Sequence, residues 1–429
     1  MLSAKAALRT GRAAGVRTLV TSSDLPNGVN AVSTAFNGPV ASVALFSDLG
    51  TRSETPATNG ALAVVAQARA AAAGAAVAKL GGAVTGAATR DGSSLVATVL
   101  KRARAPGGAR ALRGAAEAPS AAAFEAAKAS VLAAQGGMVE EVHGCAYLEA
   151  PYGLPANGTA ASLANVTHTD AAALLAAPTA YTAVGVGCDD LAAFGALPAA
   201  SAGLVAFDDG AAAIFTGSDK KTSYDGLPLA ELAVAYEFPL LSSEFGAAAT
   251  LLPSVLGAGA NAGGASLKEP YNAHGKLVRD LAEQGAAAFV APFYAPYADT
   301  ALFGVHLAAP DVRVEDAVWY TMNNLVRLSF GVTDAELARA KLAYKAELGA
   351  SIASPAAVAA MLGAHVKLLG APLAPNELLA MVEDVELDEI KALAYEHLHD
   401  CDHALAAVGP VHELPDYNYV RTASYNHHS

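Results

Sequence analysis

Asn-Gly-Ala-Leu-Ala-Val-Val-Ala-Gln, residues 59–67, begins the stretch of sequence that decides the fold. It follows an expected strand at 40–49 and a polar turn at 50–58, in which Ser53, Thr55 and Thr58 can cap a helix. The helix expected at about 60–79 is nearly all Ala, Val and Leu. Such a composition favours burial and helix formation and supplies no group for acid–base chemistry.

The frame around this helix resembles the pitrilysin-type (M16) metallopeptidase family, in which the same position reads Asn-Gly-x-x-His-x-x-Glu-His. In that inverted motif two His bind zinc and the Glu activates a water, so all three share one helical face. The matching positions here are Ala63, Ala66 and Gln67. Alanine can neither bind a metal nor take up a proton, and a glutamine amide is at best a weak oxygen ligand. The resemblance therefore implies the fold of the family with no catalytic residue, no metal site and no cofactor.

Further motifs that resemble the family lie after the helix. The nearest acid to the family's third, distal zinc ligand is Glu125, and one carboxylate cannot hold zinc alone. The fold signature remains although the chemistry is absent. The matching segments are Leu-Gly-Gly-Ala-Val at 80–84, Thr-Arg-Asp at 89–91, His-Gly-Cys-Ala-Tyr at 143–147, and Pro-Tyr-Gly-Leu-Pro at 151–155 followed by Gly158.

The composition limits the classes of protein to consider. The 429 residues are 53% hydrophobic and 16% charged, which allows two or three domains with real cores. A net charge of −13 is the wrong sign for nucleic acid or an anionic membrane face. No apolar run reaches the roughly 18 residues of a membrane span, so we expect no transmembrane segment. Three widely spaced cysteines predict thiols in a reducing compartment, and no haem, iron–sulfur or nucleotide motif occurs.

The N-terminal residues 1–20 are basic and lack an acid before Asp24. A basic, acid-free stretch with Ser, Thr and Ala is typical of a mitochondrial presequence, and a chance basic tail is the alternative. If the presequence is removed, we expect the mature chain to begin between residues 19 and 23. The basic residues are Lys5, Arg9, Arg12 and Arg17.

The N-terminal domain is expected at 21–216. Mixed strands with helices on one face indicate an α+β fold rather than a doubly wound sheet. The expected elements are a hairpin at 25–36, strands at 40–49, 94–100 and 181–187, a long helical region at 120–147 and a short helix at 170–175.

A polar, turn-rich stretch at 217–228 is the expected linker, followed by a C-terminal domain at 229–410 and a tail at 411–429 that is either a partner-binding arm or disordered. The order of elements repeats after the linker, which agrees with two homologous halves, each a mixed and mostly antiparallel sheet. Thr333 and Glu336 predict a capping box. The expected strands are 231–238, 286–292, 301–307 and 404–409, and the expected helices are 245–256, 271–284, 314–328, 334–348 and 388–399.

A glycine-rich stretch at 256–266 is the candidate binding segment of the second half. Its glycines allow backbone amides to approach an extended peptide or an anion closely. It does not follow a strand, which argues against a nucleotide loop, and a mobile lid without a ligand is the alternative. The candidate residues are Gly257, Gly259, Gly263 and Gly264.

Two other clusters suggest chemistry. His397, His399, Cys401 and His403 are metal-ligand types, but a helix would place the first two about 200° apart. The adjacent acids at 140–141 also point away from each other on a helix, so a solvated helix face is the better interpretation.

The resemblance implies a non-catalytic core subunit of mitochondrial respiratory complex III, peripheral on the matrix side of the inner membrane. The implied partners are a sister core protein and the cytochrome b, cytochrome c1 and Rieske subunits. The alternative is a non-catalytic, α-type subunit of the mitochondrial processing peptidase, which presents presequence peptides to a β-type subunit. An independent metallopeptidase is nearly excluded by Ala63, Ala66 and Gln67.

Overall fold

The structure is a computed structural model that describes residues 20–134, 136–148, 152–177, 179–197, 213–260 and 275–425. It divides into two compact units, and each is described by itself. The N-terminal unit contains Thr18–Ile214 together with the distant segment Gly349–Ala374. The C-terminal unit contains Phe215–Leu348 and Pro375–Ser429.

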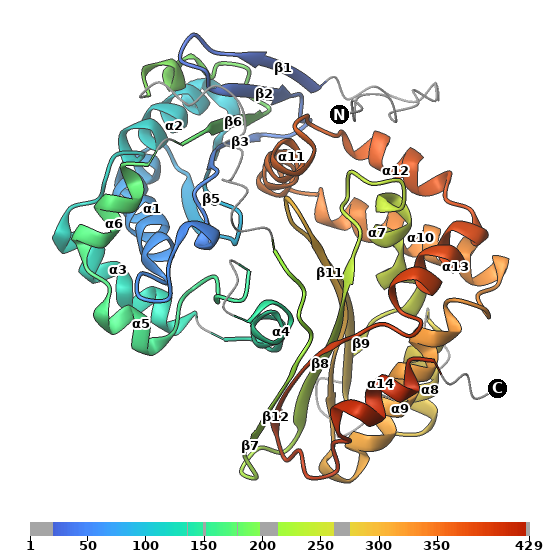
Figure 1. Cartoon of the computed structure of the whole chain (residues 1–429). Helices are drawn as coiled ribbons and strands as arrows, with labels where there is room; N and C mark the ends of the chain where they lie inside the picture. The colour runs from blue at the N-terminus through green and yellow to red at the C-terminus, as the bar shows by residue number, and fades with distance from the viewer. Residues whose placement is uncertain are drawn as a thin grey trace. The chain divides into compact units, whose positions relative to one another are not determined.

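The N-terminal unit is built on a six-stranded sheet with the order β1-β2-β6-β3-β5-β4 (Figure 1). Strands β2 and β6 are parallel, and every other neighbouring pair is antiparallel. The strands are β1 (Val20–Asp24), β2 (Asn30–Thr34), β3 (Val40–Ser47), β4 (Ala83–Ala88), β5 (Ser93–Leu100) and β6 (Tyr181–Val186).

Helices cover both faces of this sheet. Ala41, Val43 and Leu45 of β3 lie in one cluster with residues of α1 and α2, whereas Ala44 lies in another cluster with α11. Because successive side chains of a strand point to opposite faces, α11 covers the face that α1 and α2 leave open. The helices are α1 (Ala61–Lys79), α2 (Lys101–Ala115), α3 (Ala121–Ala133), α4 (Met138–Tyr147), α5 (Ala160–Asn165), α6 (His168–Leu175) and α11 (Pro355–Leu369).

The C-terminal unit repeats this arrangement. Its sheet has the order β7-β12-β8-β11-β10-β9, and β7 and β12 form its parallel pair. The five strands β2-β6-β3-β5-β4 therefore correspond in order and direction to β7-β12-β8-β11-β10. The strands are β7 (Asp219–Ser223), β8 (Ala230–Phe238), β9 (Gly259–Ala260), β10 (Phe289–Pro296), β11 (Ala301–Ala309) and β12 (Ala404–Gly409).

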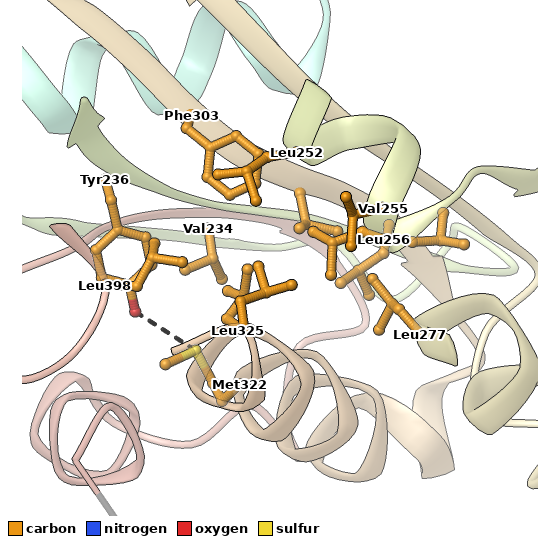
Figure 2. Packing of buried hydrophobic residues seen from close by; sticks show 14 of the residues in the cluster. Val234, Tyr236, Leu252, Val255, Leu256, Leu277, Phe303, Met322, Leu325 and Leu398 are labelled. Carbon is orange, nitrogen blue, oxygen red and sulfur yellow. Dashed lines mark hydrogen bonds between the residues drawn. The ribbon is translucent and has the colours of Figure 1, made fainter. Parts of the chain in front are cut away.

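The core of the C-terminal unit packs large side chains of β8 and β11 against helices (Figure 2). Phe303 and Tyr236 project from neighbouring strands, and the Tyr236 hydroxyl donates to Met322 Sδ at 3.6 Å. The helices are α7 (Gly246–Leu256), α8 (Lys276–Glu283), α9 (Val314–Arg327), α10 (Asp334–Ser351), α12 (Pro375–Glu383), α13 (Leu387–His397) and α14 (Tyr417–Ala423).

These elements confirm the expected α+β fold of two similar halves. Strands β3, β5, β6, β8 and β12 lie where the sequence predicts them. The capping box is also confirmed, since Thr333 N donates to Glu336 Oε2 at 3.0 Å and Glu336 N donates to Thr333 Oγ1 at 3.3 Å.

One expected region is helical but interrupted, and two other expectations about elements are wrong. The helical region at 120–147 is two helices, α3 and α4, separated by Gly136 and Gly137, which both have positive φ angles. The expected linker contains β7, which pairs with β12. Residues 417–423 of the expected tail form α14, whose Val420 is fully buried in the C-terminal core, so this part is neither an arm nor disordered.

The segment 349–374 is the largest departure from the expected domain plan, because the sequence places it inside the C-terminal domain at 229–410. Its helix α11 was not predicted. Within the described residues, α1 is one helix whose length and apolar composition suffice to cross a membrane, and 61% of its most apolar window is buried inside the protein. Cys145 and Cys188 are buried thiols, and Cys401 is a half-buried one.

Candidate functional site

The start of α1 is held by a buried carboxylate. Glu54 accepts hydrogen bonds from the backbone amides of Gly60 and Leu62, both at 2.7 Å, and from Asn59 Nδ2 at 3.1 Å. An acid beside a helix N-terminus satisfies amides that lack partners within the helix. Burial raises the pKa of Glu54 to about 7, while these three hydrogen bonds lower it. The expected caps Ser53, Thr55 and Thr58 are wrong, since no side chain of the N-cap residue binds the first turn and Glu54 does so instead.

The three positions that match the zinc motif lie on the buried side of α1. Ala63 and Ala66 are each 2% exposed, and Gln67 Nε2 donates to the carbonyl oxygen of Gly86 on β4 at 2.9 Å. A Cβ on Gly86 would overlap the carbonyl oxygen of Ala66, so glycine lets the helix approach this edge strand closely. The Gln67 amide is therefore engaged in joining α1 to β4.

A cavity of about 640 Å³ lies beside Gln67, between α1, α3 and β4. Its wall is mostly alanine, with the Gln67 amide and the Ser130 hydroxyl as polar groups. Ser130 Oγ donates to its own helix at the carbonyl oxygen of Ala127, at 2.7 Å. Neither polar group is an acid, a base or a strong metal ligand. Across the described part of the chain, no group of three or more His, Cys, Asp or Glu side chains is arranged to hold a metal ion.

The family-like motifs after α1 meet in a buried polar network. Arg90 donates to both carboxylate oxygens of Glu140, at 3.1 and 2.7 Å, and its Nε donates to the carbonyl oxygen of Tyr152 at 2.9 Å. The Tyr152 hydroxyl accepts from Arg52 at 2.5 Å and donates to Asp91 at 2.8 Å. Bidentate arginine pairs of this kind fix geometry strongly. The network joins four segments of the N-terminal unit, which are the turn at Arg52, the turn at 90–91, helix α4 and the loop at Tyr152.

His143 lies next to this network and is not suited to acid–base work. Its ring is buried, and its Nδ1 donates to the carbonyl oxygen of Val139 at 2.5 Å. Burial, together with the cationic Arg90, lowers the pKa of His143 to about 3. The expectation that residues 140 and 141 form a solvated face is wrong for Glu140, because Arg90 and the Ala156 amide hold it. Arg90 and these hydrogen bonds lower the pKa of Glu140, against the raising effect of burial.

The histidines near the C-terminus have separate aromatic partners. His397 contacts Phe238 with ring centroids 5.3 Å apart, and His403 stacks on Tyr417 at 4.2 Å. Burial lowers the pKa of His403 to about 4. His399 stacks on Tyr395 at 4.8 Å. The rings are thus distributed among different contacts and are not gathered around one point.

The remaining candidate residues are only partly described. Gly257 ends α7 with a φ of 81°, and a Cβ there would lie 2.7 Å from the Gly275 amide nitrogen. Gly259 belongs to β9 and pairs with Val290. Gly263 and Gly264 lie outside the described residues.

Glu125, the nearest acid to the distal ligand position, lies on α3 and forms an ion pair with Lys128 at 3.0 Å. Its side chain is 59% exposed, which is typical of a surface pair on a helix.

Part of the chain is similar in sequence to a known family. Residues 193–344 match the Peptidase M16 inactive domain. A probable mitochondrial-processing peptidase subunit beta from Arabidopsis thaliana is 30% identical over 214 residues, which cover 50% of this chain and 39% of that protein. Cytochrome b-c1 complex subunit 1 from Saccharomyces cerevisiae is 27% identical over 303 residues, which cover 66% of this chain and 64% of that protein. The chain thus spans less than two thirds of these relatives.

A solved structure matches the fold over nearly the whole chain. A chain in "Complex III2 from Candida albicans, Inz-5 bound" has a TM-score of 0.83 and 22% identity, with 95% of this chain and 100% of that chain covered. Within the family, the sequence motifs look most like core protein 2 of ubiquinol:cytochrome c reductase, and this finer assignment stays a prediction. Residues 193–344 thus match the Peptidase M16 inactive domain, in a chain that has the fold of the matched complex III chain.

Proposed function

We propose that this chain is a non-catalytic core subunit of mitochondrial respiratory complex III. The sequence motifs resemble the core protein 2 type, whereas two complex III relatives bear the name of subunit 1. The observation that carries the proposal is the state of α1. The helix is held by Glu54 and is joined to β4 through Gln67, yet the positions that match the zinc motif are Ala63, Ala66 and Gln67. A fold maintained around a site without reactive groups serves packing and assembly rather than catalysis.

The proposed partners are the sister core protein 1 and the cytochrome b, cytochrome c1 and Rieske subunits. The chain would lie peripherally on the matrix side of the inner membrane, delivered by a presequence at residues 1–20. Two relatives with the names of a complex III subunit and a mitochondrial peptidase subunit support this location. Residues 1–19 lie outside the described residues, so the presequence rests on their basic composition.

A second candidate is the non-catalytic α-type subunit of the mitochondrial processing peptidase. Several relatives bear the name of the beta subunit of that enzyme, which supports a relation to the enzyme and not to its α type. A net charge of −13 suits a basic presequence peptide, and Gly257, Gly259, Gly263 and Gly264 are the residues proposed to contact it. Both functions can be combined in one complex.

Purification of the native assembly through this chain, in mild detergent from mitochondrial membranes, tests the proposal. We expect co-purification of the cytochrome b, cytochrome c1 and Rieske subunits. A presequence-cleavage assay on the same sample then tests the second function. Recovery of a single partner with an intact His-x-x-Glu-His motif, and no cytochrome, would contradict the core-subunit proposal and support the peptidase.

A further inference from the structure

Helix α11 comes from the C-terminal half of the sequence but completes the N-terminal unit. Figure 1 shows it alongside β3, on the face opposite α1. Gly363 faces the ring of Phe46, and a Cβ on this glycine would overlap that ring, so the helix backbone lies close to the sheet. The apolar seam joins Val358, Ala359, Leu362 and Val366 of α11 to Val32, Ala44, Val184 and Val186 of the sheet.

Lys367 lies one turn beyond Gly363 and therefore on the same helix face. Its Nζ is buried, and it has no hydrogen-bond partner among the described residues. The ammonium group sits against the backbone of Gly92, where a Cβ would overlap the Nζ. Lys367 is also the only charged residue of the helix sequence Pro355–Leu369, whose mean composition is strongly apolar. The docked helix thus carries one cation into a buried site where the ammonium group has no hydrogen bond among the described residues.

The charged groups that face Lys367 come from two connections, the one between β3 and α1 and the one between β4 and β5. Asp91 and Asp48 attract the ammonium group, and Arg52 repels it. Both carboxylates already have other partners, because Asp91 accepts from Tyr152 at 2.8 Å and Asp48 accepts from the Ala180 amide at 3.0 Å. Burial lowers the pKa of Lys367 to about 8, against the raising effect of the two carboxylates. The attraction therefore offsets only part of the unfavourable burial.

We propose that α11 is a releasable latch on the N-terminal sheet, and that the buried ammonium group of Lys367 is the element that weakens its docking. The apolar contacts of α11 hold the helix on the sheet. Loss of the Lys367 proton strengthens this docking, because a neutral amine is less costly to bury than an ammonium group. An undocked lysine keeps its proton up to its ordinary pKa, whereas the docked lysine loses it from about pH 8. Because the undocked state binds more protons in this window, docking strengthens as pH rises from 8 toward 10.5 and weakens as pH falls through 8.

Other groups around the latch do not account for this window. His365 of the same helix donates to or accepts from the carbonyl oxygen of Leu373 at 3.1 Å. Burial lowers the pKa of His365 below its ordinary value, so its ring stays neutral at pH 7 and above.

Hydrogen exchange followed by mass spectrometry on the full chain tests the latch. Protection of α11 peptides at pH 7 and pH 9, corrected for the intrinsic exchange rate, is compared with protection of α1 peptides. We expect the wild-type protection of α11 to rise about tenfold between these pH values. In Lys367→Met we expect protection at pH 7 above that of the wild type and no rise at pH 9.

Lys79→Met is the matched control, because Lys79 is an exposed lysine in the last turn of α1 in the same unit. It should keep the wild-type response. Equal protection of α11 in wild type and Lys367→Met at pH 7, or weaker protection in the variant, would overturn the proposal. If Lys367→Met fails to fold, the wild-type protein alone tests the proposal. Equal protection of its α11 peptides at pH 7 and pH 9 would contradict the latch.

Discussion

The two sheets share strand order and direction, but they are stabilised differently. Buried Asp, Glu and Arg side chains in the described residues all lie in the N-terminal unit, namely Asp48, Glu54, Arg69, Arg90 and Asp91. The C-terminal core instead packs Leu, Phe, Tyr and Met side chains of β8, β11, α7 and α9. A hydrophobic core tolerates substitutions that conserve volume, whereas removal of one partner of a buried ion pair is strongly destabilising. The stability of the N-terminal unit thus depends on specific buried ion pairs and hydrogen bonds. The stability of the C-terminal unit depends on how well its apolar core is filled.

The largest expected effect comes from the apolar core. Phe303→Ala removes a fully buried ring that contacts Phe238 at 4.6 Å, and we expect a loss of about 4 kcal/mol in the free energy of unfolding. Fluorescence of Trp319, the single tryptophan, reports on this unit during urea unfolding. Phe330→Ala is the control, since Phe330 is 47% exposed. An equal loss in both variants would remove the distinction between packed core and surface.

The corresponding change in the N-terminal unit is Arg90→Ala. It leaves Glu140 and the carbonyl oxygen of Tyr152 without their shared donor, and we expect a loss of about 3 kcal/mol. The loss should appear as faster hydrogen exchange of the amides in α1 and α4 peptides. Arg313→Ala removes an ion pair with Asp316 in which both side chains are about half exposed, and should cost less than about 1 kcal/mol. Similar losses would show that the buried network adds nothing beyond a surface pair.

A smaller effect is expected where α1 meets β4. Gly86→Ala forces a Cβ against the Ala66 carbonyl oxygen and should cost about 2 kcal/mol. Gly74 lies in α1 and has open space at its Cβ position. Gly74→Ala should therefore be neutral or should stabilise the protein by up to about 1 kcal/mol. Both values come from urea unfolding of the full chain. An unchanged free energy of unfolding in Gly86→Ala would mean that α1 does not pack closely against β4.

The smallest effect is a pH dependence of the N-terminal unit. The buried His143 has a pKa lowered to about 3, so the unfolded chain takes up a proton below pH 6.5 that the folded chain refuses. Stability is complete above pH 6.5 and falls as pH is lowered toward 3. At pH 5.5 the loss should be about 1.4 kcal/mol, and it should be absent in His143→Gln. Identical acid profiles of wild type and variant would assign the acid sensitivity to other groups.

Much of the fold could be predicted because its signals are local. The apolar stretches of β3, β8 and β12 are short, bounded by turn residues and rich in strand formers. Strand β4 was missed because Ala-Val-Thr-Gly-Ala-Ala has little strand propensity, and its pairing with β5 makes the strand. Helix α2 was missed because it contains Pro106 and three glycines, which normally disfavour helices. The partners of α11 lie in β3 and β6, at a sequence distance that periodicity cannot bridge.

The candidate site could be predicted only in part. The motif segments around Arg90, His143 and Tyr152 were recognised as family-like, yet their mutual pairing depends on tertiary structure. Glu54 and Lys367 were missed. The signal for Glu54 is an acid six residues before Gly60 at the start of a helix. The signal for Lys367 is a single charge in an otherwise apolar helix, which indicates a specific role.

Depletion of this chain in the cells that make it tests the central claim, that the chain supports complex III without performing chemistry. The account predicts that assembled complex III, measured by the absorbance of its b and c1 haems after native separation, falls with the chain. Re-expression of the wild type should restore it. Undiminished assembly and haem content in the depleted membranes would contradict the account.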